Sequence, residues 1–377
     1  MTKYQRPARI VCVFGTRPDA VKMAPVVHAL RRRSNVFNTR VVVTGQHREQ
    51  LEQVLKVFNI VPDLNLNIMQ HGQSLTDITV RALQGLDEDF QENGADICLA
   101  QGDTTTTFVA GLAAFYHKIR FGHVEAGLRT GNKYDPFPEE MNRMLAAPLA
   151  SWHFAPTPVA QQNLLKEGVE KSSVHVTGNT SIDALKWVAN SGYKVADSEI
   201  EQLLVSDRPL VLITAHRREN WGEPMRNIAV SIARLAEMFP GTSFVVALHR
   251  NPIVRDTLCP VLNNIDNVHL IEPPDYAPFV LLMKASVLIL TDSGGVQEEA
   301  PTLGVPVLVL RNTTERQEGV DAGTAKLIGT NPEDIVRETV RLLTDADAHA
   351  SMAHAENPYG TGVAADLIAD ILASSVI

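Results

Sequence analysis

Short apolar runs rich in β-branched residues alternate with amphipathic stretches along most of the chain. Residues 9–15 read RIVCVFG and are followed by DAVKMAPVVHALRRR, and ADICLAQGD at 95–103 is followed by TTTFVAGLAAFYHK. A strand followed by a helix, repeated in this way, is typical of parallel sheets covered by helices on both faces. The pattern therefore predicts an α/β protein.

The alternation pauses at the polar segment SGYKVADSEIEQLLVSDRP, residues 191–209, and restarts with LVLITAHRREN. We expect two doubly wound, Rossmann-like domains, 1–195 and 196–360. A last amphipathic helix within 361–377 is expected to pack back on the first domain. Two such domains facing one another would form a cleft lined by the carboxyl ends of both sheets, where ligands of open α/β folds bind.

Composition narrows the possible functions. The 377 residues include 34 Lys and Arg against 43 Asp and Glu, a formal charge of −9, without a basic block. This argues against a nucleic-acid partner. No stretch approaches the ~20 apolar residues of a membrane helix, and the first residues lack the apolar run of a signal peptide. Three separated cysteines suggest reduced thiols. We expect a cytoplasmic protein without membrane contact.

The sequence does not support a dinucleotide-binding or a metal-binding site. Residues 360–365, GTGVAA, match the GxGxxA fingerprint, but they lie near the end of the chain without a preceding strand. No CxxC or HExxH occurs, and the histidines are scattered. The expectation is therefore no cofactor and no metal.

Candidate chemistry in the first half of the chain follows the predicted strands. Arg17 and Lys22 lie at the start of a helix in FGTRPDAVKMAP, which is either an anion site or a plain turn with exposed cations. Asp103 is a helix cap or a catalytic acid. Glu125 ends another strand, and Glu139 begins a helix, where carboxylates are favoured in any case. Three acids at one sheet edge are candidates for proton transfer.

In the second half, His216 follows the first strand and is flanked by arginines, so its pKa would respond to a bound anion. The stretch LTDSGGVQEEAP suits a nucleotide: backbone N–H groups of Ser293, Gly294 and Gly295 for a phosphate, and Glu299 for ribose hydroxyls. Arg316, in a neighbouring loop, would hold the diphosphate or anchor Glu299.

The assembled motifs resemble one family, the bacterial non-hydrolysing UDP-N-acetylglucosamine 2-epimerases, which have the two-domain GT-B fold. The resemblance covers nearly the whole chain, through FGTRPDAVKMAP, GDTTTTFVAGLAAFY, GHVEAGLRTG, PEEMNR, HRREN, LTDSGGVQEEAP and TTER. It implies interconversion of UDP-GlcNAc and UDP-ManNAc by elimination of UDP, through 2-acetamidoglucal, and re-addition.

The resemblance also implies roles for individual residues. The catalytic set would be Asp103, Glu125, Glu139 and His216. Arg17, Lys22 and His216 would stabilise the departing diphosphate, and UDP would be held by Ser293, Gly294, Gly295, Glu299 and Arg316, with Phe279 near the uracil. The sequence does not say which acid is the base for each epimer.

The family further implies a homodimer and a regulatory UDP-GlcNAc site, whose matching positions are Gln46, His47, Gln73, Arg217 and His249. The chain departs from the family at Gly72, where Arg is common, at Gln101 and at Pro274. Gly72 weakens the regulatory inference. Alternative functions are a retaining glycosyltransferase, a hydrolysing epimerase that releases ManNAc and UDP, and a non-catalytic sugar-nucleotide sensor.

Overall fold

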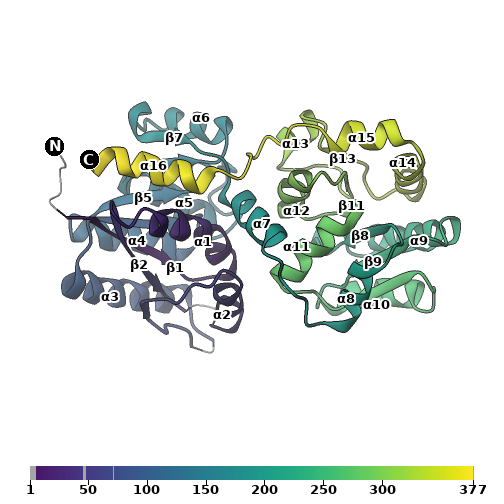
Figure 1. Ribbon diagram of the computed structural model, residues 1–377, viewed down its shortest axis with the longest axis horizontal. Coiled ribbons are helices and arrows are strands. Elements are labelled where there is room, and N and C mark those ends of the chain that lie inside the picture. The colour runs from purple at the N-terminus through teal and green to yellow at the C-terminus, as the bar shows by residue number, and fades with distance from the viewer. Residues whose placement is uncertain (1–5, 46–47, 71, 377) are drawn as a thin grey trace. The chain divides into compact units, whose positions relative to one another are not determined.

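The computed structural model describes residues 6–376 except 46, 47 and 71. It divides into two compact units, the first made of Met1–Trp187 with Tyr359–Ile377 and the second of Val188–Pro358. The sequence pattern places these boundaries at 195 and 360. Figure 1 shows the elements of both units.

The first unit is built on a seven-stranded sheet in the order β3-β2-β1-β4-β5-β6-β7. Every neighbouring pair is parallel, and the interior strand β1 pairs with β2 on one side and β4 on the other. The strands are β1 (Ala8–Phe14), β2 (Phe37–Val43), β3 (Leu64–Asn65), β4 (Ile97–Gln101), β5 (Arg120–Val124), β6 (Ala150–Ala155) and β7 (Val174–Val176).

Helices cover both faces of this sheet (Figure 1). The helices of this unit are α1 (Arg17–Arg32), α2 (Arg48–Val57), α3 (Leu75–Asn93), α4 (Thr105–Tyr116), α5 (Glu139–Ala146), α6 (Pro158–Lys166) and α16 (Ala364–Val376), with 3₁₀ turns at Ala147–Leu149 and Lys171–Ser173. Helix α7 (Thr180–Asn190) runs across the boundary between the two units. The C-terminal helix α16 packs on α1, where Arg33 bonds Asp366 at 2.9 Å and Asp370 at 2.6 Å.

The second unit has a six-stranded parallel sheet in the order β10-β9-β8-β11-β12-β13. Its strands are β8 (Leu210–Thr214), β9 (Ser243–Ala247), β10 (Val268–Ile271), β11 (Ser286–Thr291), β12 (Val307–Val309) and β13 (Ala325–Leu327). Its helices are α8 (Ser198–Val205), α9 (Glu223–Met238), α10 (Pro252–Leu262), α11 (Tyr276–Ala285), α12 (Gly294–Glu299), α13 (Gln317–Asp321), α14 (Pro332–Thr344) and α15 (Ala346–Ala353), with 3₁₀ turns at Arg218–Asn220 and Ala300–Leu303.

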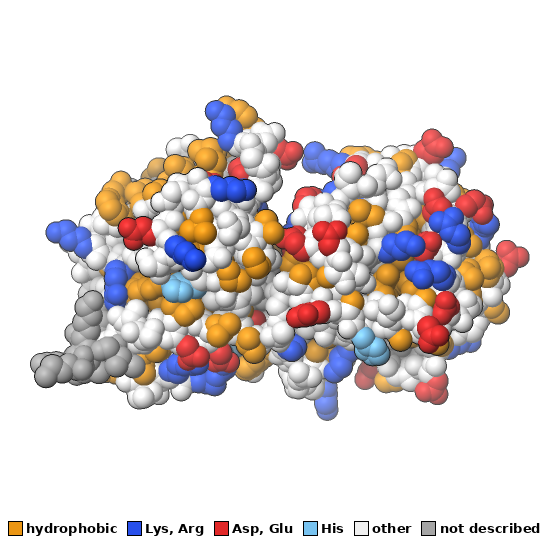
Figure 2. Space-filling model, turned by 90° about the horizontal axis from the view of Figure 1, so that it is seen from above, with side chains coloured by type: hydrophobic (Ala, Val, Ile, Leu, Met, Phe, Trp, Pro, Cys, Tyr) orange, Lys and Arg blue, Asp and Glu red, His pale blue; other side chains and the backbone are white. Residues whose placement is uncertain are grey.

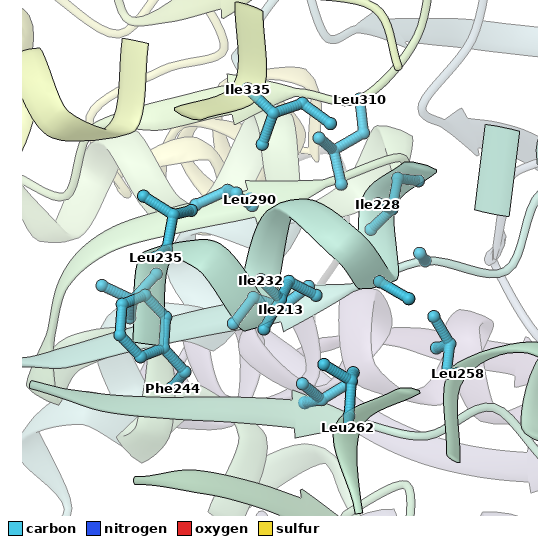
Figure 3. Packing of buried hydrophobic residues seen from close by; sticks show 14 of the residues in the cluster. Ile213, Ile228, Ile232, Leu235, Phe244, Leu258, Leu262, Leu290, Leu310 and Ile335 are labelled. Atoms are coloured by element: carbon cyan, nitrogen blue, oxygen red, sulfur yellow. The ribbon is translucent and has the colours of Figure 1, made fainter. Parts of the chain in front are cut away.

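Side chains at helical spacing on α9 form the core between that helix and the sheet. Ile228, Ile232 and Leu235 belong to one buried cluster with Ile213 and Leu290 of the strands (Figure 3). Each such side chain contributes about 1.5–3 kcal/mol when fully buried. This packing holds the carboxyl ends of β8 and β11 in place beside one another.

The two parallel sheets with helices on both faces confirm the α/β, doubly wound class. None of the helices within the described ranges is long and apolar enough to cross a bilayer. On the face drawn in Figure 2, acidic and basic side chains are intermixed. Among the residues that the structure describes, no group of three or more His, Cys, Asp or Glu side chains is placed to hold a metal ion.

Candidate active site

Three neighbouring strands of the first unit end beside one another at the carboxyl edge of its sheet. β1 leads to Arg17 and, one turn into α1, Lys22; β4 leads to Asp103 and β5 to Glu125. The strand order reverses between β1 and β4, the position where open parallel sheets bind ligands. The structure therefore gathers these predicted residues at one edge.

Glu125 is paired with Lys22 across this edge. The distance from Lys22 Nζ to Glu125 Oε2 is 2.5 Å, and the Glu125 side chain is only 8% exposed. Its backbone lies in the left-handed region, with φ of 62°, which costs a non-glycine residue roughly 1–2 kcal/mol. Residues in such conformations cluster at active sites, where the surrounding structure holds them.

Asp103 is held from α5 through both its backbone and its side chain. Asn142 donates to the Asp103 carbonyl at 2.8 Å, and Arg143 Nη2 donates to Asp103 Oδ2 at 2.5 Å. A second nitrogen of Arg143 pairs with the buried Glu140 at 3.0 Å. Arg143 therefore forms ion pairs with two carboxylates, one of which is the candidate acid Asp103.

Glu140 is stabilised as a carboxylate although it is buried. It accepts N–H groups of Thr130 and Gly131 at 3.0 and 3.1 Å. Burial alone would raise the pKa of Glu140, but these N–H groups and the Arg143 guanidinium outweigh it and hold the pKa below its usual value. Glu140 thus fixes the orientation of Arg143.

Glu139 is the first residue of α5 and is half-buried. Its side chain makes no hydrogen bond or ion pair within the described part of the chain. Residues three and four apart share one face of a helix, so Glu139 lies on the face that carries Asn142 and Arg143. α5 therefore presents Glu139 on the same face as the side chains that hold Asp103.

In the second unit, His216 follows β8 and lies beside the buried Asp292, which follows β11. Asp292 accepts the backbone N–H groups of His216 and Arg217 and the Asn220 side chain, each at 2.9 Å. Its other oxygen lies 3.2 Å from His216 Nδ1. Asp292 thereby fixes both the loop and the imidazole ring.

Several groups act on the protonation of His216. Burial lowers its pKa, Asp292 opposes the shift, and His249 and Arg217 add to the lowering, so that the net pKa is below the ordinary value. The His249 ring stacks on His216, with centroids 5.5 Å apart and planes 18° apart. A bound anion would raise this pKa and favour the imidazolium.

The glycine-rich stretch after β11 forms the start of α12. The Ser293 N–H, which the sequence pattern assigns to a phosphate, donates instead to Thr291 Oγ1 at 3.0 Å, so Ser293 can offer a ligand only its hydroxyl. Gly294 and Gly295 are the first residues of α12, whose N–H groups have no partner within the helix. A Cβ on Gly294 would lie 3.1 Å from Arg316 Cζ, so a larger residue at this position would press on the Arg316 guanidinium.

Arg316 pairs with Glu298, whose oxygen lies 2.8 Å from Arg316 Nε. The sequence pattern assigns Arg316 either to the diphosphate or to Glu299, whereas the structure shows an ion pair between Arg316 and Glu298. Glu299, one residue later, is half-buried, as is Phe279 on α11. The guanidinium of Arg316 is therefore already oriented against the start of α12.

Of the positions predicted for a regulatory site, Gln46 and His47 lie outside the described residues. Gln73 accepts the Gln70 N–H at 3.0 Å in a local turn. Arg217 and His249 lie next to His216 in the second unit. A regulatory role for these residues stays a prediction.

The sequence pattern indicated no role for Asp19, Arg143, Asn220 or Asp292. Arg143 and Glu140 stand three residues apart in PEEMNR, a helical spacing that could have indicated their pairing. The position of Asp292 at a strand end was a similar signal. The partner of Asn220, 72 residues away, could not be read from the sequence.

Comparison with known proteins decides the family. The model for UDP-N-acetylglucosamine 2-epimerase matches residues 28–373. The chain belongs to this family of epimerases. It is 51% identical to the UDP-N-acetylglucosamine 2-epimerase of Yersinia pestis, over 96% of this chain and 97% of that one. The Bacillus subtilis enzyme is also 51% identical, over 97% and 94%.

Solved structures of epimerases agree. A putative UDP-N-acetylglucosamine 2-epimerase from Listeria monocytogenes has a TM-score of 0.92 at 48% identity, covering 98% of this chain and 96% of that one. The Neisseria meningitidis epimerase, solved with UDP-GlcNAc bound, has a TM-score of 0.83 at 48% identity, over 97% and 100%. A glycosyltransferase of kitacinnamycin, 12% identical with a TM-score of 0.64, shares only the fold, in agreement with the GT-B class.

Proposed function

We propose that this chain interconverts UDP-GlcNAc and UDP-ManNAc by inverting C2 of the sugar. The observation that carries the proposal is the pair of carboxylates at the ends of the adjacent strands β4 and β5, each held by a cation: Asp103 by Arg143 and Glu125 by Lys22. Carboxylates held within reach of a substrate C–H are candidates for general acid and base catalysis.

The proposed reaction is an elimination followed by re-addition. A carboxylate removes the C2 proton, the bond from C1 to the diphosphate oxygen breaks, and 2-acetamidoglucal and UDP are formed. A protonated carboxyl group then delivers a proton to the other face of C2 while UDP adds back to C1. No oxidant is needed, because C2 loses one proton to the first carboxylate and gains one from the second carboxyl group, and UDP leaves C1 and adds back to it.

Charge on the departing diphosphate is assigned to cations of this chain. Arg17 lies exposed in the first turn of α1, and Lys22 follows one turn later, so both add to the positive end of that helix. His216, with a pKa lowered in the absence of an anion, would become a stronger hydrogen-bond donor as the diphosphate charge develops. Stabilisation of developing charge is usually the largest single contribution to catalysis.

The nucleotide itself is assigned to the second unit. The hydroxyl of Ser293 and the N–H groups of Gly294 and Gly295 would meet a phosphate, and Glu299 would accept the ribose hydroxyls. Arg316, oriented by Glu298, would supply a cation, with Phe279 near the uracil. The epimerase from Methanocaldococcus jannaschii, 32% identical with a TM-score of 0.75, was solved with UDP-GlcNAc and UDP and supports nucleotide binding.

A second UDP-GlcNAc acting as an activator, and a homodimer, extend this proposal. Of the residues expected to take part in activation, Arg217 and His249 lie against or beside His216, so a ligand there would alter the charge around that histidine. Activation predicts that UDP-ManNAc alone reacts slowly and that added UDP-GlcNAc speeds it. Light scattering tests the dimer.

Proton NMR of the anomeric signals tests the proposed reaction in a single tube. UDP-GlcNAc with the protein, without NAD and without an acceptor, should become a mixture with UDP-ManNAc. Accumulation of free ManNAc and UDP would instead indicate a hydrolysing epimerase. Unchanged UDP-GlcNAc, which reacts only after an acceptor is added, would contradict the proposal in favour of a glycosyltransferase.

A further inference from the structure

Asp19, at the third position of α1, is a buried carboxylate without a cation. It is 3% exposed and makes no ion pair within the described part of the chain. Its Oδ2 atom accepts the Thr16 N–H at 3.2 Å, the Gly15 N–H at 3.4 Å and the Thr104 hydroxyl at 3.2 Å. Burial raises its pKa to about 6, against the effect of these donors. A buried charge is costly, so its retention calls for a reason.

These donors come from two different loops. Gly15 and Thr16 follow β1, whereas Thr104 follows β4 and is the N-cap of α4, accepting the Thr107 N–H at 3.4 Å. Asp19 is thus a member of the capping box of α1 and, through one hydroxyl, also holds the cap of α4. It connects the two segments on either side of the point where the strand order reverses.

The turn after β1 also packs closely against Thr44 and against Thr106 of α4. A Cβ on Gly15 would lie 2.1 Å from Thr44 Oγ1 and 2.6 Å from Thr106 Oγ1. Asp103 immediately precedes Thr104, and Arg17 immediately follows Thr16. The carboxylate of Asp19 therefore joins the segment that carries a cation for the diphosphate to the segment that carries a candidate acid.

We propose that Asp19 is a positioning residue, which fixes the loop of Asp103 against the start of α1 so that the acid and Arg17 address the same substrate. The inference rests on the proposed epimerase activity. Asp19 need not touch the substrate, and its effect passes through Thr104 to Asp103. A displacement of about 1 Å at a reacting group can cost on the order of 100-fold in rate.

The chain contains a matched control for ordinary helix capping. Ser74 and Asp77 form the same capping box at the start of α3, with Asp77 accepting the Ser74 N–H at 2.9 Å. Asp77 is half-buried rather than buried, and its side-chain hydrogen bonds within the described part of the chain are to Ser74. Both acids cap a helix, but Asp19 alone of the two also holds a second helix.

The experiment compares Asp19→Asn, Asp19→Glu and Asp77→Asn for kcat, KM, UDP affinity and melting temperature. Asn keeps the size but removes the charge, whereas Glu is the usual residue at this position of a capping box. We expect Asp19→Asn to lower kcat at least 10-fold with UDP affinity within twofold of wild type, and Asp19→Glu to restore most of the rate. Asp77→Asn should leave kcat unchanged.

Thr104→Val and Thr104→Ser make the same test without altering Asp19, should Asp19→Asn fail to fold. Loss of the hydroxyl should lower kcat at least fivefold, and Ser should preserve it. Wild-type rates in Asp19→Asn or in Thr104→Val would overturn the inference. A fall in kcat in Asp77→Asn in proportion to its loss of stability would also overturn the inference, because it would show that the loss of any capping carboxylate slows the enzyme. An inactive wild type would instead refute the proposed function, which keeps the two failures distinguishable.

Discussion

Replacing Arg143 by Met tests the arrangement that holds Asp103. The substitution keeps most of the side-chain length but removes the ion pairs to Asp103 at 2.5 Å and to Glu140 at 3.0 Å. The Glu140 side chain is 1% exposed, so its charge would remain buried with two N–H donors. Asp103 is 25% exposed and would gain water.

The loss of folding stability in Arg143→Met comes mainly from the unpaired charge of Glu140. Removing one partner of a buried ion pair typically costs about 3–5 kcal/mol, and the two remaining N–H bonds place this case near the lower end, at about 3 kcal/mol. The more exposed pair with Asp103 adds less than about 1 kcal/mol. For a unit of this size, about 3 kcal/mol corresponds to a fall of roughly 6–12 °C in the melting temperature.

Calorimetry of Arg143→Met, Glu140→Gln and the double variant measures the effect. The double variant removes the stranded charge, so the coupling energy should be about 1–3 kcal/mol in favour of the pair. The control is Arg337→Met: Arg337 pairs with Asp334 and Glu338, but its side chain is 63% exposed, and we expect less than about 1 kcal/mol. A loss below 1 kcal/mol for Arg143→Met, or additive single effects, would refute the reasoning.

Three further predictions concern other contacts. Glu298→Gln weakens the 2.8 Å bond that orients Arg316, so calorimetric UDP affinity should fall about 10-fold, and unchanged affinity would show that the pair is irrelevant to binding. Burial lowers the pKa of His123 to about 4. Between pH 6.5 and 4 the imidazole of His123 is therefore protonated in the unfolded chain but not in the folded one. The free energy of unfolding should fall by up to about 3 kcal/mol as the pH falls through that window. In urea unfolding, the free energy of unfolding of His123→Gln should depend less steeply on pH than that of the wild type. An equal slope for the two proteins would contradict this. Asp183→Ala removes the acceptor of the first two N–H groups of α16, at 3.3 and 2.9 Å, and should speed amide exchange in that helix by a factor corresponding to about 1 kcal/mol; unchanged exchange would be the contrary result.

The sequence predicted the parts of the fold whose pattern is long enough to read. Alternating apolar strands and amphipathic helices gave the two parallel sheets, and acids directly after strands gave Asp103 and Glu125. Two edge strands, β3 and β13, were not predicted, because they are short and read LN and AKL, without the run of β-branched residues that marks the other strands. Periodicity over so few positions carries no signal.

Ion pairs between residues distant in the chain could not be predicted from the sequence either. Arg143 and Asp103 are separated by 40 residues, and Lys22 and Glu125 by 103. Asp19 and Asp77 have the same local pattern, and only the structure shows that Asp19 is buried and bonded to a second helix cap while Asp77 is half-buried and bonds only its own cap, Ser74, within the described residues. The left-handed backbone of Glu125 likewise depends on tertiary packing that overrides the local preference.

Deuterium incorporation at C2 tests the central claim most directly. UDP-GlcNAc incubated with the protein in D2O should give both sugar nucleotides with deuterium at C2, as read by the loss of the C2 proton signal. Asp103→Asn should abolish this incorporation while UDP affinity, measured by calorimetry, stays within about twofold of wild type. Formation of UDP-ManNAc with the C2 proton retained, or an Asp103→Asn protein that still exchanges at the wild-type rate, would contradict proton transfer by the acids at the ends of β4 and β5.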